Sequence, residues 1–169
     1  MIPNKLGTEE VSINPQLRKH KSNKISLITD INGIPINVKT TNSNIHDVKI
    51  LSNQLDDLKK EHPLLFNNNN ILLGDTAYDS KPLQNQLTEL NFGKIITPKN
   101  KRNIKNKEKI NQLKLNTSEK NLLKNRIKIE HTNAILKQYR RISSRYDRYI
   151  KNYKVFVLLG CLDIILKNI

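Results

Sequence analysis

Residues 71–97 have the sequence ILLGDTAYDSKPLQNQLTELNFGKIIT, and they indicate the architecture of the chain. Ile71–Leu73 is a short apolar run typical of a buried strand, and it places Asp75 at the strand's carboxyl end. Residues 81–90 follow with the pattern of a helix, and Ile95–Thr97 has the pattern of a second buried strand. A strand, a helix and a strand in this order predict a crossover between parallel strands.

The amino-terminal side predicts a hairpin followed by a helix. Lys24–Thr29 and Pro35–Thr40 alternate apolar and polar side chains, and the turn sequence of residues 30–33, Asp-Ile-Asn-Gly, lies between them. Residues 46–60 place apolar side chains at helical spacing. Together with residues 71–97, this order predicts an α/β fold with one mixed sheet that is flanked by helices.

The carboxyl-terminal side predicts a basic loop and two helices. Residues 99–117 are rich in Lys and Asn, so we expect a basic loop that is mobile without DNA. One long helix is expected from Ser118 to about Tyr139. An apolar helix from about Tyr153 to Lys167 is expected to pack under the sheet. The sequence contains no internal repeat, so residues 1–169 are interpreted as a single domain.

The charge of the chain points to an anionic partner. Its 169 residues include 30 Lys and Arg against 15 Asp and Glu, a formal net charge of +15. Such an excess is unfavourable in a compact chain unless an anion relieves it, and nucleic acid is the commonest such partner. A coding bias toward Asn, Lys and Ile in an AT-rich genome is the alternative source. Charge alone therefore identifies no function.

The remaining bulk features predict a soluble, intracellular protein that does not enter a membrane. Cys161 is the single cysteine and cannot form an internal disulfide, which is consistent with a reducing compartment. The first ten residues, MIPNKLGTEE, have neither the apolar stretch nor the cleavage site of a signal peptide. The longest apolar run, Val155–Leu166, contains Asp163 and is too short to cross a bilayer.

Two acidic residues, Asp75 and Glu130, are the candidates for catalysis. A strand end is a favoured position for functional residues in α/β sheets, and Asp75 occupies one. On one helix, Arg126, Glu130 and Lys137 would fall within about 40° of one another. Carboxylates from separate elements can hold two Mg²⁺ ions for phosphodiester cleavage, while cations hold the phosphates. The cations expected to contact DNA are Arg126, Lys137, Arg140 and Arg141.

Both carboxylates also have an ordinary structural interpretation. A helix glutamate with Arg at i−4 and Lys at i+7 is usually part of a solvated face with weak ion pairs. Asp75 could equally cap the turn that follows it. Composition and spacing by themselves therefore predict a basic α/β domain and nothing sharper.

Four blocks of sequence together resemble the catalytic domain of insertion-sequence DDE transposases, over nearly the whole chain. These blocks are NKISLITDINGIP (23–35), LLGDTAYDS (72–80), NRIKIEHTNAILKQYRRISSRYDR (125–148) and VFVLLGCLDIIL (155–166). The resemblance implies a ribonuclease H-like fold and a two-metal site that normally takes Mg²⁺. It also implies that Asp75 and Glu130 are catalytic residues and metal ligands.

The sequence departs from the family pattern at two places. One subgroup has the signature Tyr, two residues, Arg, three, Glu, six, Lys; residues 126, 130 and 137 keep these intervals, but Leu123 holds the tyrosine position. The family's first catalytic aspartate lies on the first strand, before a segment like IPNKLGTEE, and no residue here matches it. Asp30 lies in the hairpin turn and is no substitute. We therefore expect an N-terminally truncated domain, with its first strand missing or incomplete, that is inactive or nearly so.

The resemblance also implies a reaction and its partners. Strand cleavage by water would be followed by attack of the freed 3′-hydroxyl on target DNA. The partners would be the transposon ends and the target DNA, with a homodimer on the DNA as a candidate arrangement. Two alternatives remain: a non-catalytic DNA-binding remnant of a mobile element, and a related ribonuclease H-like nuclease such as a junction resolvase.

Two further motifs have more than one interpretation. His46–Asp47 is interpreted as a helix cap, and its distance from the other histidines gives no zinc-ligand spacing. Residues 145–149, Arg-Tyr-Asp-Arg-Tyr, interleave aromatic rings with cations, which suits contact with a DNA backbone. The same tract could instead connect two helices with its tyrosine rings packed inward.

Overall fold

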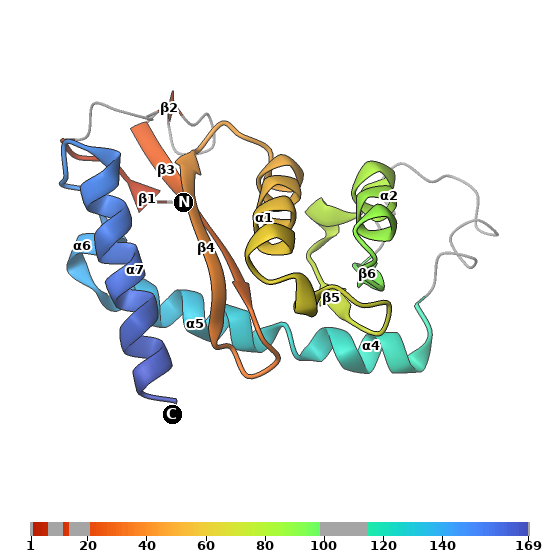
Figure 1. Cartoon of the computed structure of the whole chain (residues 1–169). Helices are drawn as coiled ribbons and strands as arrows, with labels where there is room; N and C mark the ends of the chain where they lie inside the picture. Colours follow the sequence, from red (N-terminus) through yellow and green to blue (C-terminus); the bar gives the residue numbers. More distant parts are fainter. Residues whose placement is uncertain (1, 7–11, 14–20, 99–114, 169) are drawn as a thin grey trace, which may run out of the picture. The chain divides into compact units, whose positions relative to one another are not determined.

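The computed structural model describes residues 2–6, 12–13, 21–98 and 115–168. The chain forms two compact units (Figure 1). Residues 1–46 and 127–169 make up the first unit, and residues 47–126 make up the second. Most of the basic loop expected at residues 99–117 lies outside the described residues. Among the described residues, no helix is long and apolar enough to cross a membrane.

The first unit is built on the hairpin that the sequence predicts. Strand β3 (Lys21–Thr29) pairs antiparallel with β4 (Pro35–Asn42). The short strands β1 (Ile2–Pro3) and β2 (Ser12–Ile13) pair with the beginning of β3. The alternating side chains of β3 and β4 give each strand one face toward the apolar core, which is why this segment folds as a hairpin.

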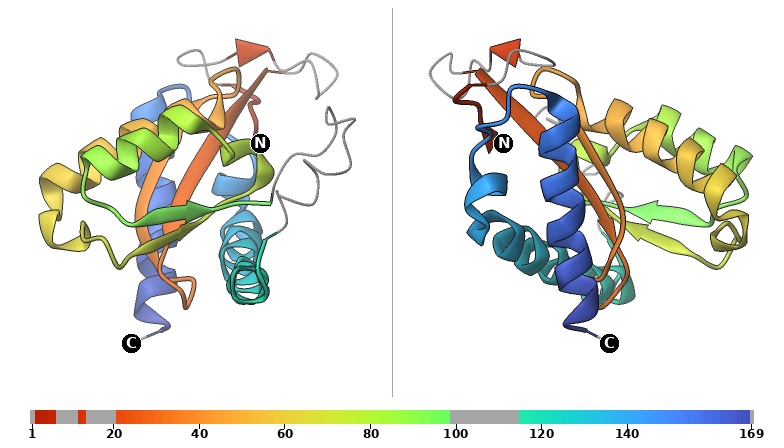
Figure 2. Two further views of the ribbon diagram at one scale, coloured as in Figure 1. Left: turned by 90° about the vertical axis from the view of Figure 1, so that its right-hand side faces the viewer. Right: turned by 60° about the vertical axis from the view of Figure 1, so that its left-hand side comes forward.

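Three helices complete the first unit: α5 (Ile127–Gln138), α6 (Arg140–Ser143) and α7 (Ile150–Leu166). Helix α7 packs against β4, as expected for an apolar helix under a sheet (Figure 2). The buried core joins the strands β1 and β3 to the three helices through residues Ile2, Leu27, Leu136, Ile142, Tyr153, Val157, Cys161 and Ile164. This core fixes α5, which carries Glu130, to the hairpin.

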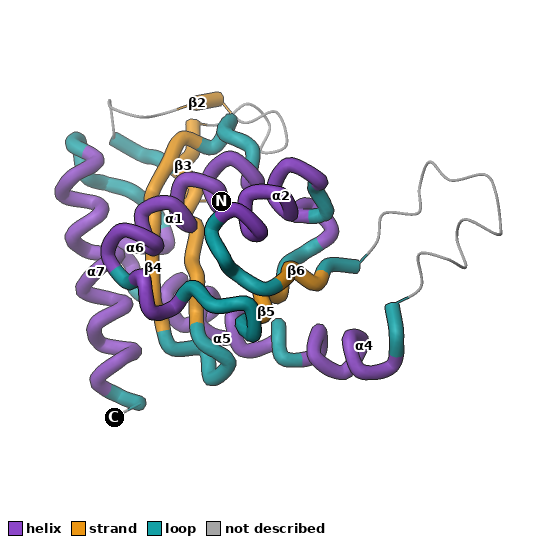
Figure 3. The backbone as a smooth tube through the Cα atoms, turned by 45° about the vertical axis from the view of Figure 1, so that its right-hand side comes forward, coloured by secondary structure: helices purple, strands orange, loops and turns teal. Residues whose placement is uncertain are grey.

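The second unit contains the predicted strand–helix–strand crossover. Strand β5 (Ile71–Leu73) pairs parallel with β6 (Lys94–Ile96), and α2 (Lys81–Glu89) connects them (Figure 3). Helix α1 (Asp47–Glu61) packs against α2, where Gln86 Nε2 donates to Asp56 Oδ1 at 2.8 Å. The hairpin, the first helix and the parallel crossover are thus confirmed.

The sheet arrangement differs from the prediction of one mixed sheet. The described strands form two sheets, an antiparallel one around β3 and the parallel pair β5–β6. The described strands pair only within their own compact unit, β1 to β4 in the first and β5 with β6 in the second. The α/β class is therefore confirmed, while the strands of the described residues do not join into a single sheet.

The prediction of one long helix from Ser118 to Tyr139 is wrong. Helix α4 (Thr117–Lys124) ends at Asn125, and α5 begins separately at Ile127. The amides of Asn125 and Arg126 donate to carbonyls three residues earlier, so the last turn tightens instead of continuing as an α-helix. The interruption falls where the two compact units divide.

Candidate active site

Asp75 lies directly beyond the carboxyl end of β5, where the sequence places it. Gly74 donates its amide to Ile96 O at 3.0 Å, which extends the β5–β6 pairing to the residue before Asp75. Gly74 is closely packed, since a methyl group there would lie 3.1 Å from Thr97 Cγ2 and 3.2 Å from Tyr78 Cβ. The strand end therefore holds the Asp75 backbone in a fixed place.

The Asp75 side chain caps the turn that follows and remains largely exposed. Its Oδ1 accepts from the Thr76 amide at 2.6 Å, at the start of the short 3₁₀ helix Thr76–Tyr78. Its side chain is 62% exposed. Both this hydrogen bond and the ion pair with Arg126 involve Oδ1, and the exposed side chain leaves room for a ligand. The capping role and a ligand role are therefore compatible.

Arg126 lies beside Asp75, although 51 residues separate them in the sequence. Its Nη2 is 3.8 Å from Asp75 Oδ1, and its side chain is 26% exposed. At this distance and exposure the ion pair contributes little to stability. The arrangement instead places a guanidinium, which suits a phosphate oxygen, next to a carboxylate, which suits a metal ion.

The structure corrects the helical face that the sequence predicts around Glu130. Arg126 lies in the turn between α4 and α5, so it shares no helix face with Glu130 and Lys137. Glu130 and Lys137 both lie on α5 with exposed side chains, seven residues apart and hence on one side of that helix. Arg126 therefore lies outside the helix that carries Glu130, and tertiary structure brings it to Asp75.

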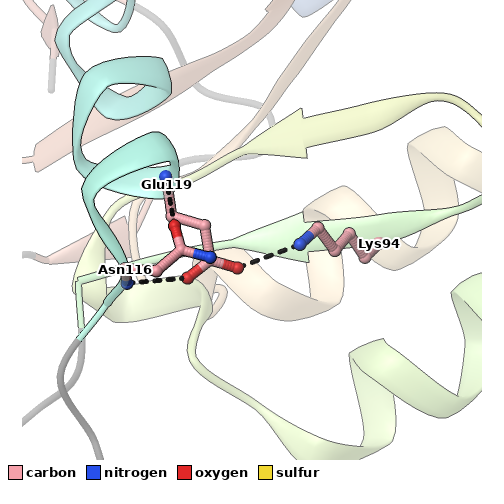
Figure 4. A network of polar contacts seen from close by, with 3 residues as sticks. All are labelled: Lys94, Asn116 and Glu119. Carbon is pink, nitrogen blue, oxygen red and sulfur yellow. Dashed lines mark hydrogen bonds and ion pairs between the residues drawn. The ribbon is translucent and has the colours of Figure 1, made fainter.

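A polar network fixes the beginning of α4, the helix that precedes the turn containing Arg126 (Figure 4). Asn116 Oδ1 accepts from the Glu119 amide at 2.7 Å, and the Asn116 amide donates to Glu119 Oε2 at 3.3 Å. This is a capping box, so Asn116 is the cap of the helix. Lys94 Nζ also donates to Glu119 Oε1 at 2.9 Å, which ties α4 to the first residue of β6.

Tyr78 was not among the residues that the sequence singled out, although it lies three residues after Asp75. Burial first, and then the nearby carboxylates of Asp47 and Asp75, together raise the pKa of its phenol from 10.0 to about 12. Tyr78 is therefore a neutral hydrogen-bond donor at physiological pH. Asp47 begins α1, as expected of the His46–Asp47 pair, and the structure adds that its charge acts on the same phenol as Asp75.

The remaining candidate DNA contacts lie in the first unit. Arg140 and Arg141 are exposed on α6, which follows α5 after a break at Tyr139. The Arg141 guanidinium is partly engaged, because it contacts Asp147 Oδ1 at 3.1 Å and lies 4.7 Å from the Phe156 ring centre. Arg140 is thus the more accessible of the two cations.

The tract of residues 145–149 connects α6 and α7, as one of its two interpretations expected, but its tyrosine rings do not pack inward. Arg145 is fully buried, and its guanidinium donates to the carbonyls of Asp147 and Arg148 at 3.0 Å each. It therefore holds the α6–α7 connection together and is not available to DNA. The tyrosine rings point outward instead, with Tyr146 and Tyr149 both exposed.

The proposed metal ligands are two carboxylates on different units. Asp75 belongs to the unit of residues 47–126, and Glu130 belongs to the other unit. Among the described residues, no group of three or more His, Cys, Asp or Glu side chains is gathered in one place. The exposed carboxylate oxygen of Asp75 is the hard oxygen donor that Mg²⁺ prefers, so the residue type fits the ion.

Comparison with known protein families matches residues 10–162 to the transposase DDE domain. The chain belongs to this family. It is also 26% identical over 160 residues to a putative transposase for insertion sequence element IS402 of Burkholderia cepacia, an alignment that covers 92% of the chain and 68% of that protein. No solved structure matches the chain. The resemblance to insertion-sequence DDE transposases is thus confirmed.

Proposed function

We propose that the chain is the catalytic domain of an insertion-sequence DNA transposase that cuts and joins DNA strands with divalent metal ions. The observation that supports this most is the exposed Asp75 carboxylate at the strand end, beside Arg126, in a member of the transposase DDE family. In this proposal the chain is a ribonuclease H-like domain, and Asp75 and Glu130 are ligands of the same metal ions. The substrates are transposon ends and target DNA.

Each residue has a distinct task in the proposed site. Asp75 and Glu130 would hold the metal ions, and Asp75 can do so through Oδ2 while Oδ1 caps its turn. Bound Mg²⁺ would stabilise charge on the attacking and leaving oxygens of the phosphodiester. Arg126 would hold the phosphate next to Asp75, and the other DNA phosphates would be held by Lys137, Arg140 and Arg141.

The metal site is tested with Fe²⁺, which cleaves a polypeptide locally when it replaces Mg²⁺ and is given ascorbate and peroxide. We expect backbone cleavage near both Asp75 and Glu130 in the purified chain. Asp75→Asn and Glu130→Gln should each reduce cleavage at both places, because the ion is shared. Glu89→Gln, a change at an exposed glutamate of α2, is the matched control. Cleavage at only one place, or unchanged cleavage in both variants, would contradict the shared site.

The 169-residue polypeptide alone should have little catalytic activity. None of its residues matches the family's first aspartate, and loss of a metal ligand misplaces the ion and the nucleophile. We expect DNA binding that persists in EDTA and no Mg²⁺-dependent nicking of a supercoiled plasmid above background. Nicking that disappears in Asp75→Asn would overturn the prediction of inactivity while supporting the proposed function.

A further inference from the structure

A buried hydrogen bond joins the hairpin turn to the helix that carries Glu130. Thr132 Oγ1 on α5 donates to Gly33 O at 2.7 Å, across 99 residues of sequence. The Thr132 side chain is buried, with 4% of the residue exposed. The same hydroxyl lies 3.0 Å from Lys128 O, one turn earlier on α5. It has one hydrogen, and the shorter contact is the one that crosses between elements.

The turn presents the Gly33 carbonyl from a rigid frame. Asp30 Oδ1 accepts from the amides of Asn32 and Ile34 at 2.9 and 2.8 Å, which closes the turn on its own side chain. Gly33 has a φ of 91°, a conformation that favours glycine. A methyl group there would also lie 2.9 Å from Thr132 Oγ1 and 3.1 Å from Lys128 O. Glycine therefore permits both the turn and its close approach to α5.

We propose that this contact, the Gly33–Thr132 clasp, fixes the rotation of α5 and thereby orients Glu130. Thr132 is then a positioning residue, and the inference rests on the proposed function, in which Glu130 is a metal ligand. Glu130 lies between Lys128 and Thr132 in the sequence. It therefore belongs to the same turn of α5 that the Thr132 hydroxyl contacts at Lys128 O. At 100° per residue, Glu130 lies about 160° around the helix from Thr132. While Thr132 rests on the hairpin turn, Glu130 points away from it.

The clasp gives α5 a directional contact, which the apolar core does not provide. Leu136 packs α5 into the core of the unit, but the free energy gained by burying apolar surface does not depend on direction. A hydrogen bond is directional and weakens steeply away from its preferred angle. The Thr132 hydroxyl therefore selects one rotation of α5 among those that the core accepts.

The test combines amide hydrogen exchange with the Fe²⁺ cleavage described above. Thr132→Val removes the hydroxyl and keeps the branched shape, whereas Thr132→Ser keeps the hydroxyl. In Thr132→Val we expect exchange at residues 128–134 to rise about ten-fold, the factor for one lost hydrogen bond. We expect Fe²⁺ cleavage near Glu130 to fall about ten-fold relative to cleavage near Asp75, as for the loss of an outer-shell partner. Thr132→Ser should behave as the wild type in both measurements.

Two further variants keep the result interpretable. Thr88 on α2 makes the same bond to a carbonyl four residues earlier, Gln84 O at 3.1 Å, on an exposed surface. Thr88→Val is therefore the matched control and should leave both readouts at residues 128–134 unchanged. Gly33→Ala changes the other partner of the clasp. It keeps the Thr132 hydroxyl, but the added methyl group displaces that hydroxyl from the Gly33 carbonyl. It should reproduce the effect of Thr132→Val, which keeps the test valid if one variant folds poorly.

The outcomes separate the clasp from the proposed function. Wild-type cleavage at both carboxylates, with no change in Thr132→Val or Gly33→Ala, would overturn the clasp and leave the metal site standing. Faster exchange in Thr132→Val without any wild-type cleavage would overturn the metal site and with it the orienting role of the clasp. Equal loss in Thr132→Ser and Thr132→Val would show that packing, and not the hydroxyl, holds α5.

Discussion

At the scale of single residues, Asp75 has a structural contact and a proposed catalytic role at once. Asp75 Oδ1 accepts a hydrogen bond from the Thr76 amide in the turn. The Arg126 guanidinium forms its ion pair with the same oxygen. A carboxylate that is oriented by its own turn needs little reorganisation to bind an ion through Oδ2. The cap that the sequence offered as an alternative to catalysis is therefore part of how the side chain is oriented.

The raised pKa of Tyr78 makes the folded protein less stable as the pH rises into the alkaline range. Its pKa is raised from 10.0 to about 12, first by burial and then by the charges of Asp47 and Asp75. The unfolded chain releases this proton near pH 10 and the folded chain near pH 12, so stability falls across that interval and is intact below it. We expect Tyr78→Phe to show a smaller fall in melting temperature between these two pH values than the wild type. An identical fall in both proteins would contradict this assignment.

At the scale of elements, Gly160 determines how closely α7 approaches its neighbours. A methyl group at this position would lie 2.6 Å from Ile142 Cδ1 and 3.0 Å from Leu136 Cδ2. Leu136 and Ile142 are themselves buried in the core of the first unit. The small residue thus lets α7 pack directly onto α5 and α6.

Gly160→Ala tests this packing because two effects of opposite sign compete. Alanine stabilises a helix interior by about 1 kcal/mol relative to glycine. Overpacking of a well-packed core costs about 1–3 kcal/mol. We expect the clash to prevail, so the free energy of unfolding in urea should fall by up to about 2 kcal/mol, the overpacking cost less the helix gain. Asn152→Ala, at an exposed position of α7, should be neutral or stabilising; a stabilised Gly160→Ala would show that the helices can separate at no cost.

At the scale of the whole molecule, the net charge of +15 is spread over both compact units. The cations proposed to contact DNA come from both: Arg126 from the second unit and Lys137 and Arg140 from the first. Binding to phosphates releases counterions, so affinity should depend strongly on salt. If the charge comes from an AT-rich coding bias, the lysines are scattered over the surface, and each contributes about equally to the salt dependence of DNA affinity.

The salt dependence of binding distinguishes these two origins of the charge. Lys137→Gln should reduce the slope of log affinity against log salt by about 1, since one phosphate contact is lost. Lys60→Gln removes the same charge from an exposed position at the end of α1 and should leave the slope nearly unchanged. Fluorescence anisotropy of a labelled DNA duplex over a series of KCl concentrations measures both. Equal effects of the two variants would favour diffuse charge over a defined DNA contact.

The resemblance of four sequence blocks pointed to the family, while local patterns in the sequence were sufficient for the hairpin, the parallel crossover and the apolar last helix. These features depend on the spacing of apolar residues and on turn residues such as Asp30 and Gly33, which act over a few positions. Folding alone brings Arg126 to Asp75, joins Thr132 to Gly33 and buries Arg145 against Asn23. The partners in these pairs lie 51, 99 and 122 residues apart, and no helical or strand period reaches that far. Only packing of the elements against one another can select such contacts.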